Sequence, residues 1–339
     1  IGAILGIIPF VNLITGKNFF PLIFPLVAFL SFNSSKSSLE NSDIKILYSS
    51  EGLLGQIIVA DYLLYENEKK VDGSQRILFV NRSTQTIVTY KSEEKTFFEY
   101  VNLISEKTKS SEGRMQNIEE KKALVLGLGG GSVANEFVKD GFHVDAVELD
   151  ERMAVCAKKY FDLDVKVNVN IDDARHFVKS QYSIVDTQYS VVVLDAFIGE
   201  VNPHHLFTTE FFSEIKQLLS DSGIFFINGN GFWNGDAGKG MRSVCKTLIN
   251  SGFDVELVPT SEEEDYRNLL FIATPTEGNR GQVTSDMISS LNLDDAILLT
   301  DEKPQLEILN AEANKRWREA CMKYFLSGYY SGQDKLLFK

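Results

Sequence analysis

The stretch "ALVLGLGGGSVANEF", residues 123–137, decides the fold of this chain. An apolar run typical of a buried strand breaks at closely spaced glycines and resumes as a helical pattern. Glycine backbone lets a ligand approach closely, and the helix that follows offers free N–H groups. The stretch therefore predicts a strand, a turn and a helix, with a ligand held at Gly127, Gly129, Gly130 and Gly131. The turn also fits GxGxxA, a variant of the dinucleotide fingerprint.

The same alternation continues on the C-terminal side of the glycine turn. Apolar runs that indicate strands are "HVDAVELD", "VKVNVN", "YSVVVLDAF", "GIFFINGN", "FDVELVPT" and "LLFIATP", with helical stretches between most of them. Buried strands that alternate with amphipathic helices indicate a mostly parallel sheet covered on both faces. The pattern predicts an α/β domain with a doubly wound, Rossmann-like sheet over residues 120–310, and a C-terminal helix and tail over 311–339.

The part of the chain before residue 120 follows other patterns. Residues 44–110 alternate apolar and polar positions with Gly and Asn or Asp between the runs, so we expect a small antiparallel β-hairpin domain. Residues 33–43 form a Ser-rich linker. Residues 1–32 are almost wholly apolar and carry one charge, Lys17. We interpret them as one or more transmembrane segments, with a buried helical hairpin as the alternative.

The composition limits the classes of binding partner and predicts where in the cell the protein is located. The apolar segment predicts a membrane-attached protein, and three distant cysteines without a CxxC pair favour reduced thiols and a cytoplasmic catalytic domain. Cysteines and histidines show no spacing typical of a metal site. The formal net charge of -13 argues against a nucleic-acid partner and suits a cationic ligand, although acidity also serves solubility.

Acidic residues follow the predicted strands at the edge where an open parallel sheet binds its ligand. Glu148 lies about 20 residues after the glycines, where a carboxylate can bind both ribose hydroxyls; capping of a helix is the alternative. Asp172 and Asp173 precede a helix and are candidates for its N-cap, for an adenine contact, or for both. Asp195 ends an apolar strand, where a carboxylate is costly unless it is paired or used.

An ordered set of residues resembles the spermidine synthase (polyamine aminopropyltransferase) family over roughly residues 44–310. The set is Gly127 to Gly131, Glu148, Asp173 with Ala174, Asp195 and the motif "LFTTEFF". The resemblance implies a small N-terminal β domain and a class I methyltransferase-like sheet. It assigns the ribose to Glu148, the adenine amino group to Asp173, and the methionine-derived part of the ligand to the glycine turn. Gln85, in "NRSTQT", is similar to a family glutamine that faces the nucleoside.

The motifs "DAFIGEVNPHHLFT" and "LLTDEKPQLE" look closer to a branch in which this domain follows a multi-helix membrane domain. In that branch an acid and a histidine lie on the loop after the strand aspartate. Glu200 and His205 occupy those positions and are candidate helpers of Asp195, or else members of a solvated loop.

The chain also departs from the family pattern. The second loop aspartate, which handles the acceptor amine, is replaced by Ile198. A family tyrosine that precedes an acid is replaced by Phe97 or Phe98, before Glu99, and Gly55 stands where another glutamine is expected. The nucleoside site is thus kept better than the polyamine site.

The sequence is compatible with three functions. The first, which we favour, is aminopropyl transfer from decarboxylated S-adenosylmethionine to an amine such as a polyamine, with Asp195 as the general base that makes the amine neutral. The second is methyl transfer from S-adenosylmethionine, and the third is a non-catalytic nucleoside sensor attached to a membrane transporter. No metal is expected, and edge strands in the β domain make a homodimer plausible.

Overall fold

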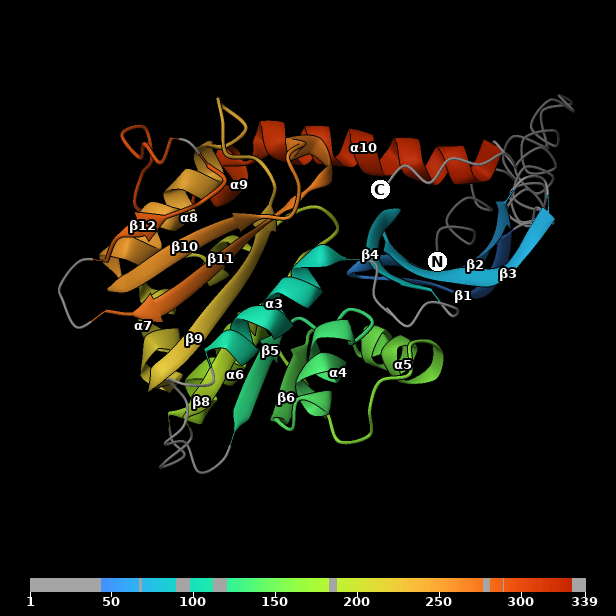
Figure 1. Cartoon of the computed structure of the whole chain (residues 1–339), viewed down its shortest axis with the longest axis horizontal. Coiled ribbons are helices and arrows are strands. Elements are labelled where there is room, and N and C mark those ends of the chain that lie inside the picture. The colour runs from blue at the N-terminus through green and yellow to red at the C-terminus, as the bar shows by residue number, and fades with distance from the viewer. Residues whose placement is uncertain are drawn as a thin grey trace, which may run out of the picture.

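The computed structural model describes residues 44–66, 69–89, 98–111, 121–182, 188–276, 281–288 and 290–330. Within them lie a four-stranded and an eight-stranded sheet (Figure 1). The smaller sheet contains β1 (Ile44–Gly52), β2 (Gly55–Glu66), β3 (Lys69–Val80) and β4 (Ser83–Thr89), paired antiparallel in that order. It is the small antiparallel unit that the alternating pattern predicts.

The larger sheet has the strand order β12-β10-β11-β9-β8-β5-β6-β7. Its strands are β5 (Lys122–Leu126), β6 (His143–Glu148), β7 (Asn168–Ile171), β8 (Tyr189–Leu194), β9 (Leu219–Asn230), β10 (Phe253–Pro259), β11 (Asn268–Pro275) and β12 (Val283–Thr284). The five strands from β7 to β9 run parallel, whereas β11 pairs antiparallel with both β9 and β10. This topology confirms the predicted Rossmann-like, methyltransferase-type α/β fold.

Helices cover both faces of the larger sheet. They are α3 (Glu99–Ser110), α4 (Ser132–Lys139), α5 (Glu151–Tyr160), α6 (Ala174–Gln181), α7 (Thr209–Leu218), α8 (Lys239–Asn250), α9 (Leu306–Leu309) and α10 (Ala311–Tyr330), with short 3-10 turns at His204–Leu206 and Glu264–Tyr266. On β8, Val191 and Val193 pack with α3 and α4, while Val192 and Leu194 pack with α6, α7 and α8. Burial on both faces explains why the strand is a continuous apolar run.

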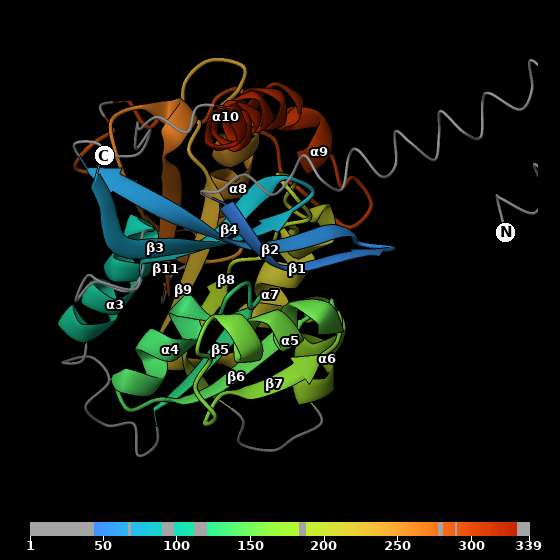
Figure 2. The same cartoon turned by 90° about the vertical axis from the view of Figure 1, so that its right-hand side faces the viewer.

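The smaller sheet packs beside the larger one through α5. Met153 and Cys156 of α5 form one buried cluster with Ile57, Val59 and Leu78 of the small sheet. In Figure 2 the small sheet lies between α10 and the helices α4 and α5. The arrangement brings β4 close to the ends of β5 and β8, where the glycine turn lies.

Two expectations from the sequence need revision. Helix α3, which the predicted β domain over 44–110 includes, packs through Val101 and Ile104 on the larger sheet. The predicted membrane attachment is contradicted, because no helix within the described part of the chain is long and apolar enough to cross a bilayer. The proposed transmembrane segment, residues 1–32, and the linker, 33–43, lie outside the described residues.

Candidate functional site

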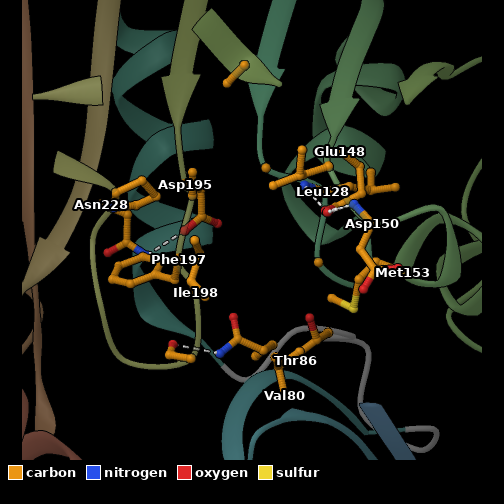
Figure 3. A pocket seen from close by; sticks show the side chains of 18 of the residues that line it. Val80, Thr86, Leu128, Glu148, Asp150, Met153, Asp195, Phe197, Ile198 and Asn228 are labelled. Atoms are coloured by element: carbon orange, nitrogen blue, oxygen red, sulfur yellow. Dashed lines mark hydrogen bonds between the residues drawn. The ribbon is translucent and has the colours of Figure 1, made fainter. Parts of the chain in front are cut away.

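A pocket lies where the carboxyl ends of β5, β6 and β8 meet the small sheet. Leu128, Glu148, Asp150 and Met153 line one side, and Asp195, Phe197, Ile198 and Asn228 line the opposite side (Figure 3). Val80 and Thr86, from the small sheet, lie between the two sides. The pocket occupies the position where open α/β sheets bind their ligands.

The glycine turn forms part of the pocket wall. Gly127 has φ +99° and its N–H donates to Val147 O at 2.9 Å, while a Cβ on Gly127 would lie 2.2 Å from the carbonyl oxygen of Asp195. The two strand ends approach this closely only because Gly127 lacks a side chain. Gly129 lines the pocket beside it, whereas Gly131, at φ +86°, is the N-cap of α4.

The fourth glycine joins the two sheets. The N–H of Gly130 donates to Thr86 Oγ1 at 2.9 Å, and a Cβ at this position would lie 2.6 Å from Thr86 Cγ2. Neither Gly130 nor Gly131 lines the pocket. These two glycines therefore fix the position of β4 and the start of α4, which is a structural contribution to the site.

Glu148 ends β6 with its carboxylate at the pocket wall. Its Oε2 accepts from Leu128 N at 3.2 Å and its Oε1 from Asp150 N at 2.9 Å. Burial raises the pKa of Glu148, and these backbone donors act in the opposite direction. The N-cap of α5 is Asp150, which accepts from Arg152 N, so Glu148 does not cap this helix.

Asp172 and Asp173 both line the pocket after β7. Asp173 is the N-cap of α6 and accepts from the N–H groups of Arg175 and His176 at 3.0 and 2.9 Å. Its other oxygen lies 3.1 Å from Nε2 of His205. Burial raises the pKa of Asp173, but the bonds from His176 and His205 outweigh it, and the net pKa is lowered. Asp173 therefore both caps α6 and lines the pocket.

Asp195 is the centre of a partly buried hydrogen-bond network. Tyr100 donates its hydroxyl to Oδ2 at 2.8 Å, and Asn228 donates its amide to Oδ1 at 2.8 Å. Asn268 in turn donates to Asn228 Oδ1 at 2.9 Å. Burial raises the pKa of Asp195 more than its two donors lower it, and the pKa of Tyr100 is also raised by burial and by Asp195. Tyr100 therefore remains a hydroxyl donor at neutral pH.

Sequence reasoning missed Tyr100, Asn228 and Asn268. The tyrosine expected before Glu99 stands one residue after it, and Phe98 also lines the pocket. The signal for Tyr100 was its place next to an acid at the start of a helix that packs on the sheet. The two asparagines have no sequence signal, because they become neighbours only through the antiparallel pairing of β9 with β11.

The remaining candidates separate into two groups. Gln85 and His205 line the pocket, and Gln85 donates to Gly199 O at 3.2 Å. Glu200 does not line it; its carboxylate binds Nη1 of Arg318 in α10 at 2.8 Å. The structure therefore brings Glu200 to the C-terminal helix and not to Asp195.

The pocket is strongly acidic. Among its described lining residues are five carboxylates and neither lysine nor arginine; the acids are Glu148, Asp150, Asp172, Asp173 and Asp195. Of these, Asp150 is paired with Arg152 at 2.6 Å. Such a lining favours a ligand with positive charge.

The fold defines a Rossmann-like, methyltransferase-type α/β protein with an acidic pocket at the carboxyl ends of its parallel strands. Within it, residues 100–261 match the family described as the spermine/spermidine synthase domain. A probable spermidine synthase from Corynebacterium glutamicum superposes with a TM-score of 0.51 at 17% identity, covering 87% of this chain and 98% of that one. This likeness supports the fold.

Curated relatives of two kinds are similar to parts of this chain. A polyamine aminopropyltransferase from Vibrio vulnificus is 35% identical over 140 residues, which is 40% of this chain and 44% of the relative. An N-terminal histidine N-methyltransferase from Emericella nidulans is 32% identical over 178 residues, 50% of this chain and 31% of the relative. The chain spans less than half the length of these two proteins.

Proposed function

We propose that this protein transfers an aminopropyl group from decarboxylated S-adenosylmethionine to an amine. The observation that carries this proposal is the charge of the pocket, with five carboxylates and neither lysine nor arginine among its described lining residues. Decarboxylated S-adenosylmethionine presents a sulfonium and an ammonium group and no carboxylate. The intact cofactor would bring a carboxylate that finds no cationic lysine or arginine there. The family match over residues 100–261 supports the same reaction.

The nucleoside is assigned to the side of the pocket that contains Glu148. Glu148 would accept hydrogen bonds from the ribose hydroxyls, with its position fixed by the N–H groups of Leu128 and Asp150. By the family resemblance, Asp173 and Gln85 face the base, and the glycine turn lies along the methionine-derived chain. Asp172 completes this wall.

The reaction needs a neutral amine close to the sulfonium. The amine nitrogen attacks the methylene carbon bonded to sulfur, the C–S bond breaks, and its electron pair stays on sulfur as a neutral thioether. The new C–N bond leaves the nitrogen positively charged until it loses a proton. Because the sulfonium is already a good leaving group, most of the rate comes from positioning the two reactants.

Asp195 is proposed as the group that binds the acceptor ammonium and accepts its proton. An alkyl ammonium has a pKa of about 10.4, so a base in the pocket must remove a proton before attack. The raised pKa of Asp195 makes this carboxylate a better proton acceptor than an exposed one. Tyr100 and Asn228 hold Asp195 in place. His205 lies against Asp173, and Glu200 is paired with Arg318 of α10.

The experiment that tests this function is a calorimetric titration of the full chain with the two forms of the cofactor. We expect the decarboxylated form to bind at least about tenfold more tightly, a difference of about 1.4 kcal/mol. Preference for intact S-adenosylmethionine would instead support methyl transfer, the activity in the name of the Emericella nidulans relative. NAD serves as the control for unspecific nucleoside binding.

A substitution of Glu148 tests the proposed nucleoside side of the pocket. Glu148→Gln is expected to weaken binding of 5′-methylthioadenosine by about 10- to 100-fold, since a hydrogen bond to a charged group contributes about 1.5–3 kcal/mol. The matched control is Glu151→Gln, which removes an exposed acid from α5 without touching the pocket. Equal affinities of the two variants, measured by calorimetry, would remove Glu148 from the nucleoside site.

A further inference from the structure

The two sides of the pocket differ in charge. Four of its five carboxylates, Glu148, Asp150, Asp172 and Asp173, follow β6 and β7 on the nucleoside side. Asp195 is the one carboxylate that the described residues contribute on the side of β8 and β9 (Figure 3). We call this side, with Asp195, Phe98, Phe197, Ile198 and Trp317, the acceptor end.

Contacts with neighbouring residues place Phe98 and Trp317 at this end. The ring of Phe98 lies 5.9 Å from that of Tyr100, which donates to Asp195. Trp317 lines the pocket next to Arg318, whose guanidinium binds the loop that follows β8. Trp317 is also packed against a buried cluster that contains Phe232. Beyond its hydrogen-bond partners Tyr100 and Asn228, the single carboxylate therefore shares this end with apolar side chains.

Ile198 projects into this end from a fixed turn. Its N–H donates to Val201 O at 2.9 Å and its carbonyl accepts from Val201 N at 3.2 Å, with Gly199 at φ +65° between them. The side chain lines the pocket and is 46% exposed. The nearest acid along the chain, Glu200, is neutralised by Arg318 at 2.8 Å and does not line the pocket.

The charges at the acceptor end do not match an acceptor that has two ammonium groups. One ammonium can bind Asp195, but a second would lie among Phe197, Ile198 and Trp317 without a carboxylate. A second ammonium there would lose hydration without gaining a carboxylate partner, and a cation–π contact with an aromatic ring offsets only part of that loss. An alkyl or aryl group at the same place would instead be stabilised by the apolar surface that it removes from water.

We infer that the acceptor is a monoamine with an apolar body, and not an aliphatic diamine. The ammonium binds Asp195, and the alkyl or aryl part packs on Phe98, Phe197, Ile198 and Trp317. The inference rests on the proposed aminopropyl transfer and specifies its substrate class. In this inference, Ile198 is the residue that favours an apolar end group over a second ammonium group.

A pair of amines of equal size tests this inference. Pentylamine and 1,4-diaminobutane have the same number of heavy atoms and differ in one end group, a methyl against an ammonium. With the full chain and decarboxylated S-adenosylmethionine, we expect kcat/KM for pentylamine to exceed that for 1,4-diaminobutane by about tenfold or more, with adducts identified by mass spectrometry. A preference for 1,4-diaminobutane would overturn the acceptor class and leave the transferase function intact.

Ile198→Asp supplies a second test at a position whose backbone bonds do not involve the side chain. We expect it to shift the kcat/KM ratio toward 1,4-diaminobutane by about tenfold or more, because it adds a partner for the second ammonium. Ile198→Asn has the same shape without the charge and should keep the preference for pentylamine. An equal ratio in both variants would contradict the role of Ile198, and transfer to neither amine in any variant would overturn the transferase function as well.

Discussion

Replacing Asp195 with Asn is expected to lower kcat for aminopropyl transfer by about 10²- to 10⁴-fold, the range that general acid–base groups contribute. The substitution removes the proton acceptor, while the amide keeps the shape of the carboxylate and can still bond with Tyr100 and Asn228. Affinity for 5′-methylthioadenosine should change by less than about threefold, because Glu148 lies on the other side of the pocket. Single-turnover kinetics and calorimetry measure the two effects separately.

The dependence on pH distinguishes a base from a merely structural residue. The raised pKa of Asp195 means that its proton is lost at a higher pH than from an ordinary aspartate. Rates of the unmodified protein should therefore rise with pH through this raised pKa, and the Asp195→Asn variant should lack that rise. A variant whose rate keeps the same rise would exclude Asp195 as the proton acceptor.

A measurement of thermal stability shows whether the Asp195→Asn variant is correctly folded. A raised pKa in the folded state means that the charged carboxylate is less favourable there than in the unfolded chain, so Asp195 stabilises the fold less as pH rises through that pKa. At neutral pH the Asp195→Asn variant should thus unfold at a temperature no lower than the unmodified protein. Asp221→Asn, which removes an exposed charge at the start of β9, is the matched control and should keep full activity.

The part of the pocket at the ends of β5, β6 and β7 was largely predictable from sequence because its residues are close together in the chain. The glycine turn, Glu148 and Asp173 lie within about 50 consecutive residues, in the repeating order of strand, ligand-binding turn and helix. The period of the apolar residues places each of these side chains at the end of a strand. The structure keeps that order, and Glu148, Asp172 and Asp173 all line one pocket.

The acceptor end was not predictable in the same way because its residues are far apart in sequence. Tyr100, Asn228 and Trp317 reach the same pocket as Asp195 only when α3, β9 and α10 are packed, and no local pattern specifies that arrangement. Glu200 failed as a neighbour of Asp195 for the same reason, since its partner Arg318 lies 118 residues away on α10. Spacing along one loop cannot show which side chains a distant helix will neutralise.

The close approach of two strand ends at Gly127 gives the largest expected effect on stability. Gly127→Ala places a Cβ 2.2 Å from the carbonyl oxygen of Asp195, and the position has φ +99°. The left-handed backbone alone costs about 1–2 kcal/mol with a side chain present. Separating the strand ends adds to this, because the oxygen belongs to backbone that cannot rotate away. We expect a total loss of about 4 kcal/mol or more, together with weaker nucleoside binding.

The substitution Gly141→Ala separates the cost of the left-handed backbone from the cost of the steric contact with Asp195. Gly141 has φ +83°, close to that of Gly127, but a Cβ there would meet no atom within 4 Å. This control should therefore lose only the backbone contribution of about 1–2 kcal/mol and keep its affinity for 5′-methylthioadenosine. Urea unfolding gives both free energies, and their difference measures the contact between Gly127 and Asp195. Equal losses would mean that the end of β8 moves aside freely, and the network that holds Asp195 would then be less rigid than its hydrogen bonds to Tyr100 and Asn228 imply.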